Sequence, residues 1–286
     1  MDPYNTGNPI GLGPRGHTYR KKRRIRGPLL TILALLLLSS GGWVAFQRIA
    51  AAKADTTYSV TSLAESPVVN MEKNRIERWN GVTKKVAYLT FEDGPTALTP
   101  AILDQLKKEQ VHATFFLVGT EIDLYPDSVK RIVEEGHYPG LHSMTHSRET
   151  LYDSKKADTY IKEMHQVQKR IKQLTDKQPL LSRPPFGSSP YLTKSMAKDI
   201  AKANLRVWDW SIDSMDWYYK DSAKEVAKTV ISRATEPFEI ILLHEQPQAV
   251  RAIPAIVAGL KKKGYQFAVY DEDLHTPFNF AKHPEL

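Results

Sequence analysis

The stretch VAYLTFEDGP, residues 86–95, holds the feature that decides the fold: an apolar run that stops at two adjacent carboxylates and a Gly-Pro pair. The run is typical of a buried strand and the Gly-Pro pair of a turn, so Glu92 and Asp93 stand at the predicted end of a strand. Neighbouring carboxylates repel each other, and a cation beside them is one explanation for the pair. Ordinary turn chemistry, in which acidic residues precede glycine and proline, is the other.

Similar apolar runs recur along the chain, at residues 113–119, 180–186, 205–211, 239–245 and 265–270. Stretches with helical periodicity separate them. This alternation predicts βα units and a mainly parallel sheet. The units are too few for a complete eight-unit barrel, so we expect an α/β fold built as a distorted or incomplete (β/α) barrel of about seven units.

The basic residues are concentrated at the start of the chain. Residues 1–27 hold seven lysine and arginine residues against the single acid Asp2, while the whole chain carries a net charge of +8. The charge therefore does not indicate that the folded part binds nucleic acid. Residues 28–46 contain no charged side chain, and as a helix they would span about 28 Å, close to the hydrocarbon thickness of a bilayer. Their basic flank places the tail in the cytoplasm and the rest of the chain outside.

These patterns predict four segments: a basic cytoplasmic tail (1–27), a transmembrane anchor or signal segment (28–47), an extracytoplasmic linker (48–82) and a folded domain (83–286). The small residues AKA at 52–54 resemble a cleavage site, so a secreted protein is the alternative to a single-pass membrane protein. The length of the apolar run favours the anchor. The chain has no cysteine, which excludes disulfides and lipid attachment through cysteine.

Ionisable side chains follow several predicted strands. Because parallel strands bring their carboxyl ends to one edge, where the active sites of barrels and open sheets lie, we expect these side chains to share a face. They are Glu92, Asp93, His142, His146, Arg183, Asp213, Asp216 and His244.

His142 and His146 are four positions apart, and one helical turn would place both on the same side. With Asp93 they form a predicted metal-binding set. Ser143 occupies the place of the glutamate in the HExxH motif, so this is not a protease motif. Two surface or core histidines are the alternative interpretation, and the carboxylates at the strand ends favour the metal.

Five ordered motifs carry a resemblance: TFEDGP (90–95), HSMTH (142–146), RPPFG (183–187), WSIDSMDW (210–217) and LLHE (242–245). Together they resemble the NodB-homology polysaccharide deacetylases, carbohydrate esterase family 4, and assign the domain at 83–286 to that family. The resemblance implies a distorted (β/α) barrel that removes acetyl groups from sugars such as those of peptidoglycan, chitin or xylan. We therefore expect a metal-dependent hydrolase acting on linear amide C–N bonds of N-acetylated cell-wall glycan.

The same resemblance implies roles for individual residues. Asp93, His142 and His146 match the metal ligands, usually for zinc, with cobalt or another divalent ion also suitable. Glu92 matches the base that takes a proton from metal-activated water, and Arg183 matches the residue that orients it. An amide carbonyl is a poor electrophile, which is why such chemistry needs a divalent ion.

His244 matches the general acid, since the departing amine leaves badly unless it is protonated. Asp216, or else Asp213, matches the carboxylate that tunes this histidine. The backbone N–H near Phe186 matches a donor to the oxyanion. The predicted substrate-binding residues are Pro185, Phe186, Trp217 and Leu243, with core packing as the alternative for Phe186 and Leu243.

Glu92 stands where the family has aspartate. The extra methylene shifts the carboxylate by roughly 1.5 Å on a fixed backbone, enough in principle to cost about a hundredfold in rate. Three functions follow: a membrane-anchored deacetylase of peptidoglycan amino sugars, a catalytically silenced glycan-binding homologue, or a deacetylase of chitin-like or O-acetylated polysaccharide. Glu245 also replaces a usual aspartate, and we expect it to change only a contact behind the site. No oligomeric state is indicated.

Overall fold

The computed structural model describes residues 85–286. The predicted tail (1–27), anchor or signal segment (28–47) and linker (48–82) lie outside the described residues, so these three assignments stay predictions. Within residues 85–286, no helix combines the length and the apolar character that crossing a membrane requires.

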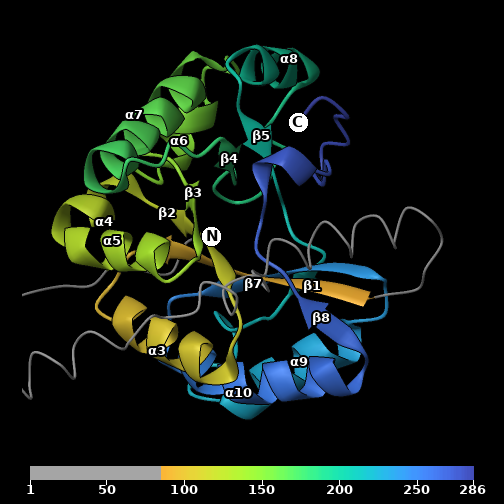
Figure 1. Ribbon diagram of the computed structural model, residues 1–286. Helices are drawn as coiled ribbons and strands as arrows, with labels where there is room; N and C mark the ends of the chain where they lie inside the picture. The colour runs from red at the N-terminus through yellow and green to blue at the C-terminus, as the bar shows by residue number, and fades with distance from the viewer. Residues whose placement is uncertain (1–84) are drawn as a thin grey trace, which may run out of the picture. The chain divides into compact units, whose positions relative to one another are not determined.

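An eight-stranded parallel sheet forms the centre of the domain (Figure 1). The strands follow the order β5-β4-β3-β2-β1-β7-β6, and β8 pairs with the first part of β1. Among the described residues, the end strands β5 and β6 do not pair with each other, so the barrel is incomplete, as predicted. The strands are β1 (Lys85–Gly94), β2 (Ala113–Leu117), β3 (Tyr138–Leu141), β4 (Leu181–Ser182), β5 (Arg206–Val207), β6 (Ile212–Asp213), β7 (Phe238–His244) and β8 (Tyr265–Phe267).

Two of the predicted strands are reduced to two residues each in the structure. The run 180–186 contributes only β4, because Pro184 and Pro185 have no N–H to continue the ladder. The run 205–211 contributes only β5, and its next residues turn toward the C-terminal segment, where the Asp209 N–H donates to the carbonyl of Phe278 at 2.8 Å.

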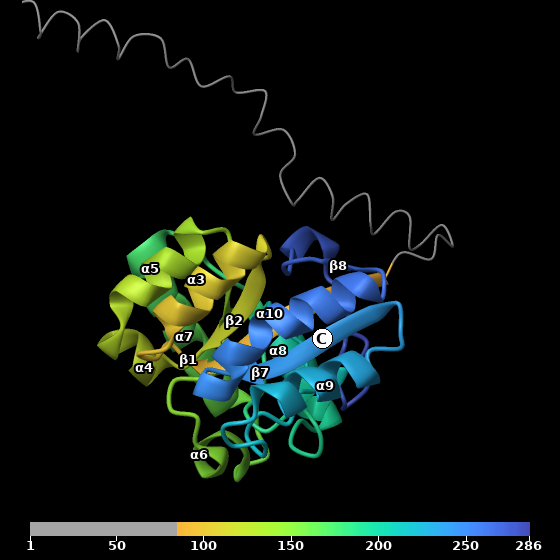
Figure 2. The same ribbon diagram turned by 90° about the horizontal axis from the view of Figure 1, so that it is seen from below.

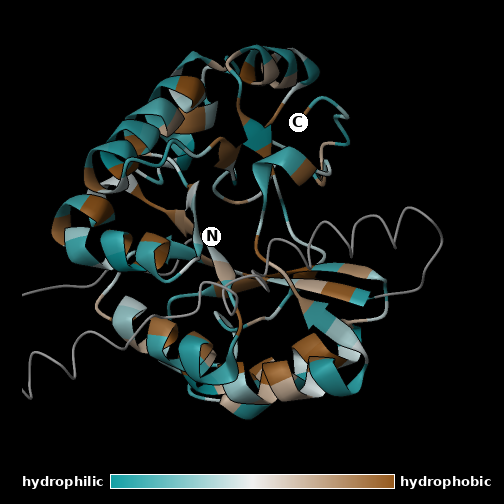
Figure 3. Cartoon of the chain, viewed as in Figure 1, coloured by the Kyte–Doolittle hydropathy of each residue, from teal (hydrophilic) through white to brown (hydrophobic). Residues whose placement is uncertain are grey.

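Helices cover the outside of the sheet, with α3, α10 and α9 beneath β1 and β7 in Figure 1 and side by side in Figure 2. Prolines stand in the first turns of α3, α5 and α10, where a missing N–H costs nothing. The helices are α3 (Thr99–Glu109), α4 (Gly119–Leu124), α5 (Pro126–Glu134), α6 (Arg148–Tyr152), α7 (Asp158–Thr175), α8 (Lys194–Lys202), α9 (Ala223–Arg233) and α10 (Pro247–Lys262), with a short 3-10 helix, η2 (Glu272–Leu274). Their apolar stripes face the sheet and their polar faces point outward (Figure 3).

Side chains of β1 point alternately to two faces of the sheet, so they contribute to two separate hydrophobic clusters. The same alternation sets which residues of β1 face the site. Leu89 and Phe91 pack in the core between the sheet and the helices. Tyr88, on the other face, joins an inner aromatic cluster that includes Trp208. Successive strand residues point to opposite faces, so Thr90 and Glu92 follow Tyr88 to the inner face at the carboxyl end of the strand.

A bulge at the end of β1 breaks this alternation. The pairing with β2 shifts between Glu92 and Gly94, and Asp93 has a φ of 66°. A bulge turns the side chain at its position away from the direction that the strand would give it. The Asp93 side chain therefore does not point to the outer face, and both adjacent carboxylates lie on the same side of the sheet.

A buried histidine near the opposite end of the sheet predicts how stability depends on pH. Burial lowers the pKa of His137 to about 3, and its Nδ1 accepts the Ala113 N–H at 3.0 Å. Unfolded histidine has a pKa of about 6.5, so between these values only the unfolded chain binds the proton and stability is lost as pH falls. From pH 6.5 to pH 5 the loss reaches at most about 2 kcal/mol from this group.

The variant His137→Asn keeps an acceptor for Ala113 but removes the titrating group. We expect its free energy of unfolding, measured with denaturant at neutral pH and at pH 5, to fall less than that of the wild type. Equal losses in both proteins would contradict the assignment.

Candidate active site

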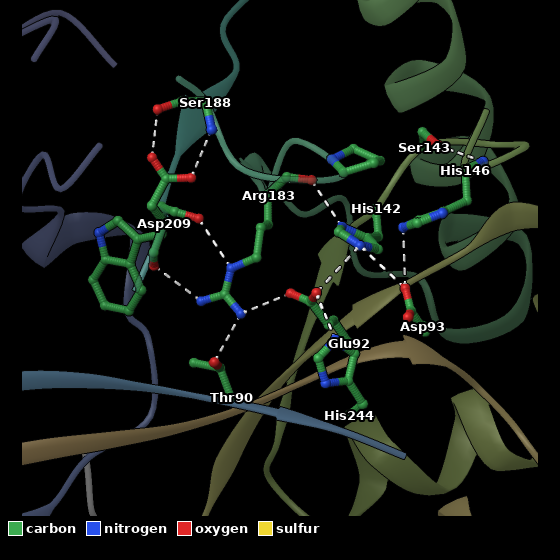
Figure 4. Close-up of polar contacts among 12 residues, drawn as sticks. Thr90, Glu92, Asp93, His142, Ser143, His146, Arg183, Ser188, Asp209 and His244 are labelled. Carbon is green, nitrogen blue, oxygen red and sulfur yellow. Dashed lines mark hydrogen bonds and ion pairs between the residues drawn. The ribbon is translucent and has the colours of Figure 1, made fainter. Parts of the chain in front are cut away.

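The predicted metal ligands meet at the carboxyl edge of the sheet, as Figure 4 shows. Asp93 Oδ1 lies 3.4 Å from His142 Nε2 and 3.2 Å from His146 Nε2. One ligand atom from each of the three residues falls within 4.8 Å of the other two. The structure thus brings together the three side chains that the sequence analysis grouped.

The backbone between the two histidines differs from the prediction. Residues 142–147 form a loop after β3 and not a helical turn, and both Ser143 and His146 have positive φ, 64° and 53°. The Ser143 side chain accepts the His146 N–H at 2.9 Å, which closes the loop in this shape. The spacing of four residues therefore brings the two imidazoles together through a tight non-helical turn.

Glu163 on α7 fixes this loop from behind. Its Oε2 accepts the N–H groups of Met144 and Thr145, each at 3.0 Å, and its two oxygens also accept the Thr145 hydroxyl at 3.1 Å. The side chain is buried, so these donors satisfy a carboxylate that is largely shielded from water. Glu163 lies in none of the five sequence motifs and was not among the predicted site residues.

The orientation of His142 suits it to bind a cation. Its Nδ1 lies 2.8 Å from the backbone oxygen of Arg183, which can only accept, so Nδ1 carries the proton and Nε2 has a free lone pair. Among the described residues, His142 Nε2 and Asp93 Oδ1 are buried atoms without a hydrogen-bond partner. Two such atoms aimed at each other, with the His146 imidazole beside them, fit a divalent ion bound through nitrogen and oxygen.

Arg183 is fully buried and contacts four groups at this edge. It donates to Glu92 Oε2 at 3.2 Å and to the hydroxyl of Thr90 at 2.8 Å, both on β1. Its other nitrogens donate to the carbonyl oxygens of Trp208 and Asp209 at 3.1 and 3.0 Å. Arg183 therefore holds the Glu92 carboxylate in a fixed place.

Glu92 lies between the metal-binding set and His244. Its Oε1 is 4.0 Å from His142 Nε2 and 3.3 Å from His244 Nε2. Burial alone would raise the pKa of Glu92, but the hydrogen bond from His244 and the charge of Arg183 outweigh it and lower the pKa. The longer side chain of glutamate thus reaches the site as an ionised group.

His244 is held by Asp216. The Asp216 Oδ1 atom lies 2.7 Å from His244 Nδ1, and its Oδ2 accepts the His244 N–H at 2.6 Å. Burial would lower the pKa of His244, but the hydrogen bonds with Asp216 and Glu92 raise it to about 11. Asp213 instead accepts from the Met215 N–H and the Trp217 indole, so of the two candidate partners Asp216 is the one that contacts the histidine.

The predicted substrate-binding residues divide into two groups. Phe186 and Trp217 are about half exposed, and the Phe186 ring lies 4.9 Å from that of His146, centre to centre. Pro185 and Leu243 are buried, and Leu243 belongs to the core between sheet and helices. Their contact with an acetyl group stays a prediction, and for Leu243 the structure shows the core packing that was the alternative.

Glu245 fixes the turn that follows Asp93. Its Oε2 accepts the N–H and hydroxyl of Thr96 at 3.0 and 2.7 Å and the hydroxyl of Thr99 at 2.6 Å. The carboxylate fills the space beside Gly94, where an added Cβ would stand 2.1 Å from Glu245 Oε1. As expected, this residue lies behind the site, but it supports the backbone that presents Asp93.

The chain is similar in sequence to proteins of a known family. The family described as "Polysaccharide deacetylase" matches residues 80–208. A peptidoglycan-N-acetylglucosamine deacetylase of Bacillus cereus is 41% identical over 271 residues, which cover 91% of this chain and 97% of that protein. The chain belongs to the polysaccharide deacetylase family. This membership confirms the resemblance and the prediction of an enzyme, a hydrolase.

Solved structures of polysaccharide deacetylases share the fold. A polysaccharide deacetylase from Bacillus cereus superposes with a TM-score of 0.69 at 44% identity, covering 71% of this chain and all of that one (100%). The catalytic domain of a peptidoglycan N-acetylglucosamine deacetylase from Eubacterium rectale gives a TM-score of 0.63 at 28% identity, covering 70% of this chain and 94% of that one.

Glu163 was not predicted because it stands among the apolar residues that form the buried face of α7. It stands on the buried stripe of α7, between Tyr160 and Val167, at a position where helical periodicity calls for an apolar side chain. A charged residue on such a stripe marks a buried carboxylate that needs donors, and that signal was present in the sequence.

We expect Glu163→Ala to weaken binding of Zn²⁺ by about tenfold or more, because it leaves the N–H groups of Met144 and Thr145 in the histidine loop without their acceptor. The measurement is competition with a chromophoric chelator. The matched control is Gln168→Ala on the same helix, whose amide donates to Pro179 at 2.8 Å, away from the loop. An equal loss in both variants would show a general effect of α7 and contradict the role of Glu163.

Proposed function

We propose that the chain is a metal-dependent deacetylase that removes acetyl groups from N-acetylglucosamine units of peptidoglycan. The observation that carries the proposal is the convergence of Asp93, His142 and His146 beside an ionised Glu92 and a protonated His244. The Bacillus cereus relative named for this activity, alignable over nearly the whole chain, supports the choice of substrate.

Asp93, His142 and His146 would hold the divalent ion, for which we propose Zn²⁺. Two imidazole nitrogens and one carboxylate oxygen are ligands that zinc accepts, with positions left open for water and substrate. When bound, such an ion polarises the acetyl carbonyl and makes water beside it more acidic. The hydrogen bond from His142 to the Arg183 carbonyl sets the ring orientation for this purpose.

Glu92 is the proposed general base. Its carboxylate takes a proton from the attacking water while the water oxygen forms a bond to the acetyl carbon. Arg183 keeps Glu92 in place and balances its charge. The backbone N–H of Phe186, in the turn after β4, is the proposed donor to the oxyanion that forms.

His244 is the proposed general acid. As the C–N bond breaks, its protonated imidazole gives a proton to the departing amine, and the products are acetate and a free amino sugar. The carboxylate of Asp216 favours the protonated ring before the transfer, and the raised pKa of His244 keeps the proton in place at neutral pH.

We also propose that this domain lies outside the cytoplasmic membrane and is anchored there by residues 28–47. The basic tail followed by an uncharged run supports the placement, which brings the site to the cell wall. In fractionated cells we expect the chain in the membrane pellet and cleaved by protease added to spheroplasts. Full-length chain in the culture medium would oppose the anchor, and chain shortened near residue 54 would indicate signal cleavage.

The first test measures acetate released from peptidoglycan and from N-acetylglucosamine oligomers by the full chain. We expect release that a chelator abolishes and Zn²⁺ restores. Glu92→Gln should lower kcat about a hundredfold or more, since it removes the base while keeping the size of the side chain. No release with any divalent ion would contradict the proposal. Release only from chitin-like or O-acetylated glycans would show that these glycans, and not peptidoglycan, are the substrate.

The variant Glu92→Asp separates a working glutamate base from a silenced site. We expect it to lose activity, because the shorter side chain withdraws from the place where Arg183 and His244 hold the carboxylate. Activity that appears only in the aspartate variant would instead favour the silenced glycan-binding homologue.

Variants at Asp216 and Asp213 test which carboxylate raises the pKa of His244. Asp216→Asn removes the charge that raises the pKa of His244, so the alkaline fall of kcat/KM should move to lower pH by about one unit or more. Asp213→Asn is the control, since that carboxylate contacts Met215 and Trp217 and not the histidine. Identical pH profiles for Asp216→Asn and wild type would oppose the assignment of His244 as the acid.

A further inference from the structure

A second group of metal-ligating side chains overlaps the proposed ion site. Glu92, Asp93 and His244 each offer one oxygen or nitrogen atom, and these three atoms lie within 4.8 Å of one another. Asp93 belongs to both groups, because it also faces the two loop histidines. Figure 4 shows Glu92 between His142 and His244, so the second group lies on the other side of Glu92 from the first.

His244 has the orientation of a metal ligand. Its Nδ1 lies 2.7 Å from Asp216 Oδ1, and a carboxylate that accepts from one ring nitrogen leaves the other nitrogen, Nε2, to bind an ion. His244 Nε2 is 3.3 Å from Glu92 Oε1. Two ligand atoms at about 2.0–2.1 Å from a tetrahedral zinc ion are about 3.3 Å apart, so one ion fits between this nitrogen and this oxygen.

The length of the Glu92 side chain makes this pair possible. Arg183 donates to Oε2 of the carboxylate at 3.2 Å, which leaves Oε1 directed toward His244. Aspartate, the usual residue of the family at this position, would withdraw the carboxylate by roughly 1.5 Å on the same backbone. The second group is therefore a consequence of the residue by which this chain differs from the family pattern.

We propose that a second Zn²⁺ binds to Glu92, Asp93 and His244 when the ion is in excess, and that it inhibits the enzyme. The inference rests on the proposed function, since this ion would occupy the oxygen of the base and the nitrogen of the acid. Its binding releases the proton of His244 Nε2 to solvent, and no proton is then left for the departing amine. Ions in two-metal sites lie about 3.5–4 Å apart and repel each other, so the second binds more weakly than the first.

The first measurement counts bound metal. The full chain is dialysed against increasing Zn²⁺, and the ions per chain are determined by elemental analysis. We expect two ions in the wild type, the second bound at least about tenfold more weakly. Glu92→Gln replaces the carboxylate by a neutral amide of the same size and should retain only the tight ion, which also reports that the variant is folded. His165→Ala, which removes an exposed histidine on α7, is the control and should still bind two.

Acetate release by the wild type is the second measurement. Activity should rise as Zn²⁺ fills the first site and fall by about tenfold or more as the second fills. A single bound ion in the wild type, or a second ion that remains in both Glu92→Gln and His244→Ala, would overturn the second site. Full activity with two ions bound would overturn the inhibition.

The two measurements also separate this inference from the proposed function. Two bound ions without acetate release at any Zn²⁺ concentration would tell against the proposed function and leave the second site standing. One bound ion with acetate release would tell against the second site alone.

Discussion

A buried guanidinium at the carboxyl edge of the sheet is the interaction on which the site depends. Arg183 supplies the charge that compensates Glu92, and its backbone oxygen orients His142. One residue therefore positions both the proposed base and a proposed metal ligand, through different atoms. Loss of the guanidinium would leave a buried carboxylate without its partner, which typically costs about 3–5 kcal/mol. Most of the inner polar network would have to rearrange.

Adjacent carboxylates on a regular strand would point to opposite faces. Glu92 keeps the inward direction of the strand, and the bulge with its left-handed Asp93 turns the second carboxylate to the same side. The two then have separate partners: Arg183 and His244 for Glu92, and the two loop histidines for Asp93. This division explains how two negative charges share one strand tip, because each has its own compensating groups.

The strand ends could be predicted from sequence because polarity changes abruptly there and parallel topology brings those ends to one edge. The convergence of Asp93, His142 and His146 was predictable for this reason, since it requires only topology. The helical turn predicted at 142–146 was wrong, because left-handed backbone at Ser143 and His146 is fixed by contacts from Glu163 on a distant helix. The position of Phe280 could not be predicted from local sequence patterns either, because it depends on the buried Asp209, which accepts the Phe280 N–H.

The contact between Gly94 and Glu245 restricts the order in which this site can change. Since three donors hold the Glu245 carboxylate where a Cβ at position 94 would stand, a side chain at 94 would push this carboxylate away from its donors unless residue 245 is shorter. A shorter residue at 245 therefore makes later changes at position 94 less costly. A library that varies both positions should yield survivors in which a larger residue 94 accompanies a smaller residue 245, so the two sites should covary although one ends β1 and the other follows β7.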